Sequence, residues 1–113
     1  MEKQLIVNLL LETGLFIENQ YIYKYADLIT DNLNTEYIDK KTQQHHIIPQ
    51  YCFEINGKQV DNSKSNLVNL LYKDHLIAHY YLACCSVDSC VYKNLLAMRY
   101  VASNFDFNIH FSF

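Results

Sequence analysis

The chain has 113 residues, which is the size of one domain with one hydrophobic core. Half of the residues are hydrophobic, and the two glycines and single proline exclude disordered and collagen-like classes. The formal net charge of -3 argues against a protein that binds nucleic acid through its overall charge. We therefore expect one folded domain, with any nucleic-acid contact confined to part of its surface.

The chain shows no sign of a membrane or secretory segment. No apolar run approaches the roughly 20 residues that span a bilayer, and acidic Glu2 and Glu12 flank the short apolar block near the N-terminus. Two of the four cysteines are adjacent and none forms a CxxC pair, which supports neither a disulfide framework nor a zinc ribbon. We expect reduced thiols and a cytoplasmic location, in a bacterial cell or a phage-infected host cell.

Two helices are predicted in the N-terminal segment, residues 1–41. Apolar side chains at helical spacing predict a helix over residues 3–13, and Gly14 is a natural stop for it. Apolar and aromatic positions predict a second helix over residues 16–33. The polar run that follows, at residues 39–41, predicts the boundary of this segment.

The middle segment, residues 42–84, begins with short strands around a long loop. The stretch HHIIPQYCFEI is β-branched at its start, and Pro49 lacks the N–H that a central strand needs, so we expect a strand to end near Ile48. Residues 54–66 are rich in Asn, Asp, Ser and Gly and predict a long loop. A second apolar run follows at residues 67–72.

Two more helices are predicted toward the C-terminus. Asp74 is expected to cap a helix that continues through His79 and Leu82. Asp88 is expected to cap a final helix in the C-terminal segment, residues 85–113. The element order as a whole predicts a single α+β domain.

Four of the five histidines lie between positions 45 and 79. His75 and His79 are four residues apart on a predicted helix, so both imidazoles share one face and could bind one divalent metal. Adjacent His45 and His46 point to opposite faces of a strand, so one could join the metal while the other takes a proton from water. Each pair alone is also typical of an ordinary core, surface or turn histidine pair. His110 is expected to be an ordinary tail histidine.

The pattern HHIIP, then a loop, then NLVNL and DHLIAH resembles the HNH motif of the ββα-metal, or His-Me finger, nucleases. The resemblance covers about residues 43 to 84. It implies a small ββα-metal core with a β-hairpin and a long loop, flanked by N-terminal and C-terminal helices. It also implies hydrolysis of phosphodiester bonds, leaving 5′-phosphate and 3′-hydroxyl ends.

The resemblance implies a role for five residues. His46 becomes the general base, and His45, His75 and His79 become the ligands of one divalent metal ion, as in the three-histidine site of the colicin-type nucleases. The metal, which could be Mg, Mn, Ni or Zn, is not identified. Asn66 gains a scaffold role, tying the loop back to the strand, with metal binding by its amide as an alternative.

Positive charge gathers around the motif. Residues 40–73 carry five lysines and two acidic residues, whereas residues 1–39 carry two lysines and seven acidic residues. We expect the five lysines to contact DNA, with a merely solvated face as the alternative. They are Lys40, Lys41, Lys58, Lys64 and Lys73.

The leading hypothesis is a compact HNH endonuclease acting on DNA, of the kind found in phages and mobile elements. The alternative is an HNH-fold phage-type module that binds or inhibits another protein, such as a host defence nuclease, through its acidic N-terminal helices. The low net charge favours the alternative. The intact base His46 beside a complete ligand set favours the enzyme, because neither protein binding nor a purely structural metal site requires that base.

Overall fold

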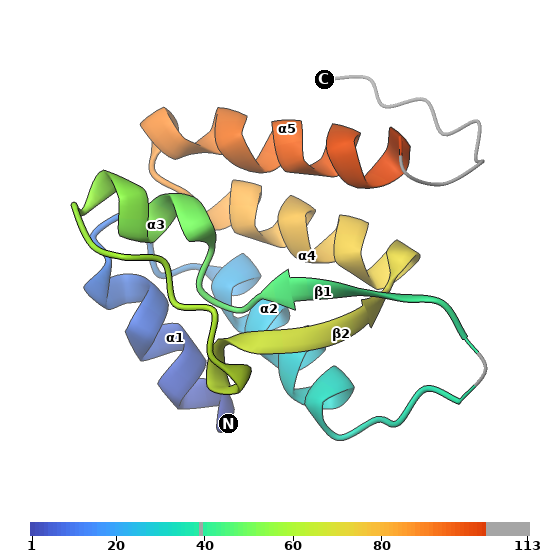
Figure 1. Ribbon diagram of the computed structural model, residues 1–113. Helices are drawn as coiled ribbons and strands as arrows, with labels where there is room; N and C mark the ends of the chain where they lie inside the picture. Colours follow the sequence, from blue (N-terminus) through green and yellow to red (C-terminus); the bar gives the residue numbers. More distant parts are fainter. Residues whose placement is uncertain (39, 104–113) are drawn as a thin grey trace.

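Helix α4, Tyr72–Cys85, lies at the centre of the fold. It packs against α2, Gln20–Leu33, against α5, Asp88–Ser103, and against both strands of the sheet (Figure 1). The computed structural model describes residues 1–38 and 40–103, and within them the chain forms five α-helices and one two-stranded antiparallel sheet. The predicted α+β class is confirmed.

The first helix, α1, covers Lys3–Glu12 and ends one residue before the predicted end, with Thr13 as its C-cap. Gly14 follows with a φ of 76°, in the left-handed region that a glycine adopts without steric cost. Helix α2 begins at Gln20, and the predicted start at residue 16 is wrong. The side chain of Asn19 caps α2 by accepting from the N–H of Tyr21 and Ile22, so the residues before it stay outside the helix.

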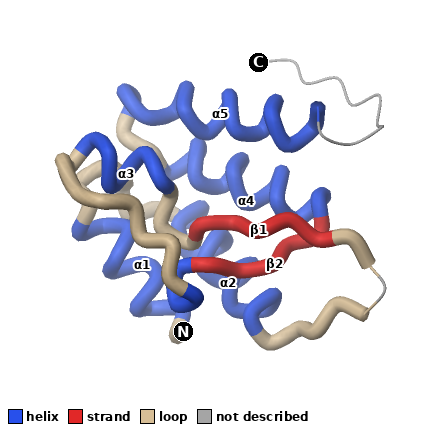
Figure 2. The backbone as a smooth tube through the Cα atoms, in the orientation of Figure 1, coloured by secondary structure: helices blue, strands red, loops and turns tan. Residues whose placement is uncertain are grey.

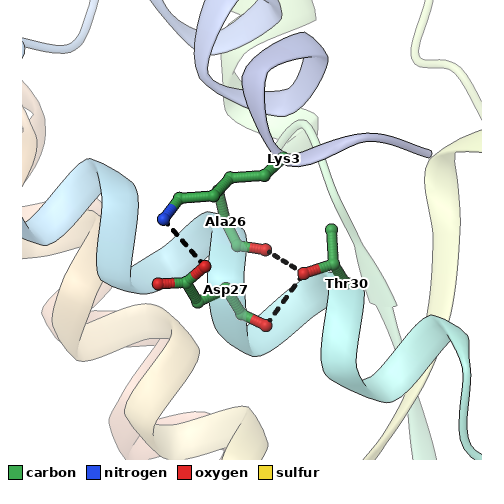
Figure 3. A network of polar contacts seen from close by, with 4 residues as sticks. All are labelled: Lys3, Ala26, Asp27 and Thr30. Carbon is green, nitrogen blue, oxygen red and sulfur yellow. Dashed lines mark hydrogen bonds and ion pairs between the residues drawn. The ribbon is translucent and has the colours of Figure 1, made fainter.

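One ion pair joins the exposed sides of α1 and α2 (Figure 3). Lys3 Nζ lies 2.9 Å from Asp27 Oδ1, and the Thr30 hydroxyl bonds the carbonyls of Ala26 and Asp27 one turn away. Such an exposed pair contributes at most about 1 kcal/mol. The contact between these helices therefore depends mainly on buried side chains such as Leu10.

The sheet pairs β1, Thr42–His46, with β2, Leu67–Leu71 (Figure 2). Its register sets His45 opposite Val68. The strand stops at His46, two residues before the predicted end, because the next two N–H groups donate to Asn66.

The segment after Pro49 forms a helix, which the sequence did not predict. Pro49 serves as the N-cap of α3, Gln50–Ile55, and its carbonyl accepts the N–H of Cys52 at 3.0 Å. The fixed φ of a proline suits the start of a helix as well as the end of a strand, and the helix prevails here. The short 3-10 helix η1, Lys64–Asn66, likewise shortens the predicted loop at its far end.

Both aspartates that were expected to cap helices lie inside those helices instead. Helix α4 begins at Tyr72, so Asp74 lies inside its first turn rather than at its cap. Asp88 is the first residue of α5 itself. Both carboxylates still stabilise their helices, because a negative charge near the N-terminus of a helix interacts favourably with the helix dipole.

Buried apolar residues form two clusters on either side of α4. The larger cluster joins α1, α2, the sheet and one side of α4. The smaller one lies between α4 and α5 and is formed by Leu76, Met98, Val101 and Ala102. His75 and His79 therefore project from a helix that is held on both sides. No helix within residues 1–38 and 40–103 is long and apolar enough to cross a membrane.

Candidate metal centre

The structure brings His45, on β1, together with His75 and His79, on α4. One ring nitrogen of each lies within 4.8 Å of the others, and the ring centroids are 5.0 to 5.1 Å apart. His45 and His75 are buried and His79 is partly buried. The three side chains could jointly hold one metal ion, as the sequence predicts.

Gln43 fixes which nitrogen of His75 is available. Its Oε1 lies 2.7 Å from His75 Nδ1, and an amide oxygen only accepts, so Nδ1 carries the ring proton. The unprotonated Nε2 of His75 is left to act as a ligand. This arrangement, with the far ring nitrogen held by an oxygen, is typical of metal-binding histidines.

Asn94, on α5, makes the equivalent contact with His79. Its Oδ1 lies 3.4 Å from His79 Nδ1, while its Nδ2 donates to the hydroxyls of Tyr51 and Ser86. The Ser86 hydroxyl already donates to the carbonyl of Leu82, so it must accept from Asn94. The amide of Asn94 is thereby oriented with its oxygen toward His79, which makes Nε2 the free nitrogen of that ring as well.

The spacing of the two free nitrogens fits a shared ion. His75 Nε2 and His79 Nε2 lie 3.2 Å apart. Two nitrogens bound at about 2.0 to 2.1 Å to a tetrahedral ion are roughly 3.4 Å apart. With both ring protons on Nδ1, the facing atoms carry lone pairs, and a cation between them replaces their repulsion by attraction.

Burial keeps the three rings neutral. Desolvation, followed by the charge of His79, lowers the pKa of His75 to about 4, and desolvation lowers the pKa of His79 to about 4 as well. The pKa of His45 is held well below its ordinary value by complete burial and then by its histidine neighbours. A metal ion therefore meets unprotonated ligands at neutral pH.

His46 is partly buried and lines the same cleft as the three clustered histidines, a cavity of about 500 Å³. Its Nε2 lies 2.7 Å from Asn62 Oδ1, in the loop before η1, and 3.4 Å from Gln50 Nε2. The shorter contact places the ring proton on Nε2, because the amide oxygen can only accept. Nδ1 of His46 is then the nitrogen that can take up a proton.

Asn66 is buried and its amide is fully used by the backbone. Its Oδ1 accepts the N–H of Ile48 at 2.8 Å, and its Nδ2 donates to the carbonyls of Ile48 and Asp61 at 3.2 and 2.9 Å. The amide thus ties the loop to the end of β1. This geometry supports the scaffold role rather than the alternative of metal binding, since the oxygen is already engaged.

The predicted lysines and the cleft do not coincide. All five lysines are exposed, but none is among the described residues that line the cleft around the histidines. The cation that does line it is Lys93, on α5, accompanied by Tyr100 from the same helix and by Glu54 from α3. The sequence carries little signal for Lys93, because only the packing of α5 on α4 brings it near the histidines.

The cysteines are free, and three of them are buried. Burial raises the pKa of Cys52 and Cys85 to about 12, so both are protonated thiols at neutral pH and poor metal ligands. Among the described residues, the group that could hold a metal ion contains only histidines. His110 lies outside the described residues.

No family model, curated protein or solved structure matches the chain. Fold and geometry define a small α+β protein with a three-histidine cluster that could hold a metal ion, next to a cleft with a fourth histidine.

Proposed function

We propose that this protein is a metal-dependent endonuclease of the HNH type that hydrolyses DNA phosphodiester bonds. One observation carries the proposal: one ring nitrogen of each of three neutral imidazoles lies within 4.8 Å of the others, in a cleft that His46 also lines. The succession of β1, β2 and α4 is the order of a ββα-metal core, and assigning that core to this chain belongs to the proposal.

The donor set suits a catalytic metal. Three protein ligands leave one position of a tetrahedral ion open, as in hydrolytic zinc sites, whereas structural sites are closed by four. When bound, the ion would stabilise the negative charge that develops on the attacked phosphate. Imidazole nitrogens are preferred by Zn and Ni, whereas Mg prefers oxygen ligands, so we favour Zn or Ni over Mg.

His46 would act as the general base. Its Nδ1 takes a proton from a water molecule as the water oxygen forms a bond to phosphorus and the bond from phosphorus to the 3′ oxygen breaks. The leaving oxygen receives a proton from solvent. Asn62 supports this role because it holds Nε2 and leaves Nδ1 as the accepting nitrogen.

The walls of the cleft offer contacts for a nucleic acid backbone. Lys93 supplies a positive charge for a phosphate, and Tyr100, of which 70% is exposed, supplies a ring face for a sugar or base. We therefore place the DNA along α5, rather than over the five lysines of residues 40–73.

The experiment is a cleavage assay with chelator-treated protein. Plasmid DNA, single-stranded DNA and RNA are incubated with Zn, Ni, Mn or Mg, or with no metal. The proposal expects metal-dependent cutting of DNA that a chelator abolishes. Asn69→Ala, a change of an exposed residue on β2 that does not line the cleft, serves as the control and should retain activity. Absence of cutting with every metal and substrate would overturn the nuclease assignment.

A further inference from the structure

Tyr25 reaches the metal centre from α2, outside the segment that carries the histidine motif. The side chain is completely buried. Its hydroxyl oxygen lies 2.8 Å from His45 Nε2 and 2.6 Å from the carbonyl oxygen of Ile47. The tyrosine therefore joins the N-terminal helices to the strand that carries the first ligand.

The two contacts decide the proton positions. A hydroxyl has one proton, and the carbonyl of Ile47 can only accept, so the Tyr25 proton lies on the bond to Ile47. The hydroxyl oxygen must then accept from His45, which places the ring proton of His45 on Nε2. Nδ1 is left as the only unprotonated nitrogen of that ring.

We propose that Tyr25 is a positioning residue that makes Nδ1 of His45 the metal-binding atom, giving a ligand set of one Nδ1 from β1 and two Nε2 from α4. The inference rests on the metal site within the proposed function, but it does not require nuclease activity. Gln43 and Asn94 hold the Nδ1 protons of His75 and His79, so Tyr25 imposes the opposite tautomer on His45.

With Tyr25 in this role, helix α2 contributes a residue to the metal site. A tyrosine hydroxyl whose proton is already committed is a fixed acceptor, and it holds the ring orientation as well as the tautomer. The acidic N-terminal helices are then not merely an attached binding surface.

The first test is the tautomer of His45 in metal-free wild-type protein. Long-range proton–nitrogen NMR distinguishes a ring protonated at Nε2 from one protonated at Nδ1. We expect Nε2–H for His45 and Nδ1–H for His75 and His79. A wild-type spectrum with Nδ1–H on His45 would overturn the inference, and this measurement needs no variant.

The second test compares Tyr25→Phe with Tyr23→Phe. The first change keeps the buried ring and removes the acceptor, whereas Tyr23 lies on the same helix and its hydroxyl donates to exposed Glu18, away from the histidines. Zinc affinity, measured by competition with a coloured chelator, should fall about 10- to 100-fold in Tyr25→Phe and stay unchanged in Tyr23→Phe. The His45 spectrum of metal-free Tyr25→Phe should also lose its preference for Nε2–H.

Equal zinc affinity of wild type and Tyr25→Phe would contradict the inference. Its failure is distinguishable from that of the nuclease proposal. Tight zinc binding that depends on Tyr25, without cleavage of any nucleic acid, would contradict the nuclease proposal and leave the positioning role of Tyr25 intact. Cleavage that persists in Tyr25→Phe with unchanged zinc affinity would contradict the positioning role of Tyr25 and leave the nuclease proposal intact.

Discussion

His75 Nε2 and His79 Nε2 face each other at 3.2 Å, while Nδ1 of each ring is held by an amide oxygen on its outer side. Two buried lone pairs at this distance repel unless a cation lies between them. The pair is therefore better suited to binding an ion than to forming a histidine–histidine hydrogen bond, and the first predictions follow from that relationship.

Removing one member of the pair should weaken metal binding. His79→Ala deletes one of three ligands, so we expect weaker zinc binding together with lower cleavage, and partial recovery of cleavage at excess metal. In wild type, zinc at about 100 times its Kd should stabilise the fold by about 2.7 kcal/mol, and this gain should shrink in the variant. Thermal unfolding with and without zinc checks the result.

Lys73→Ala, an exposed change on the same helix, is the matched control. If His79→Ala and Lys73→Ala gained equal stability from zinc, His79 would not be a ligand.

The metal-free protein should lose stability in mild acid. Histidines titrate near 6.5 when unfolded, whereas the pKa values of His75 and His79 are about 4 in the folded chain. Between these values the unfolded chain binds more protons, so stability is fully present above about pH 6.5 and is lost as the pH falls toward 4. A pKa change from 6.5 to about 4 is worth on the order of 3 kcal/mol for each ring.

Urea unfolding of chelator-treated protein at pH 7 and pH 5 measures this loss. The difference between the two pH values should be smaller in His79→Ala, which lacks one of the depressed groups. A free energy of unfolding that is independent of pH in wild type would show that the rings are not buried as described.

Asn66 should matter for stability first and for catalysis second. Asn66→Ala leaves an N–H and two carbonyls without their partner, and each unsatisfied buried group costs about 1 to 3 kcal/mol. We expect a loss of about 3 kcal/mol in the free energy of unfolding. Asn69→Ala, an exposed change on β2, should cost far less. Equal losses in the two variants would remove the scaffold role.

Local geometry explains what the sequence could predict. The four-residue spacing of His75 and His79 is sufficient to place both rings on one helix face, because helix geometry is set within a few residues. The alternation of a strand likewise puts Gln43 on the same face as His45, a signal that the sequence analysis left unused.

The remaining parts of the site depend on tertiary packing. Tyr25 and Asn94 come from α2 and α5, and nothing in their local sequence distinguishes them from other core residues. Lys93 similarly gains its place in the cleft from the packing of α5 on α4. Helix α3 could not be predicted from Pro49, because a proline is compatible both with the end of a strand and with the start of a helix.

The most direct test of the account is the pairing of cleavage with metal affinity in His46→Ala. Loss of a general base lowers a rate by about 100- to 10,000-fold, and His46 is not one of the three clustered ligands, so cleavage should fall by that factor while zinc affinity stays near that of wild type. Excess metal should not restore the activity. If the protein binds zinc but wild type and His46→Ala show the same trace cleavage of DNA, the cleavage is contamination, the proposed mechanism is wrong, and a protein-binding role for the fold becomes the better explanation.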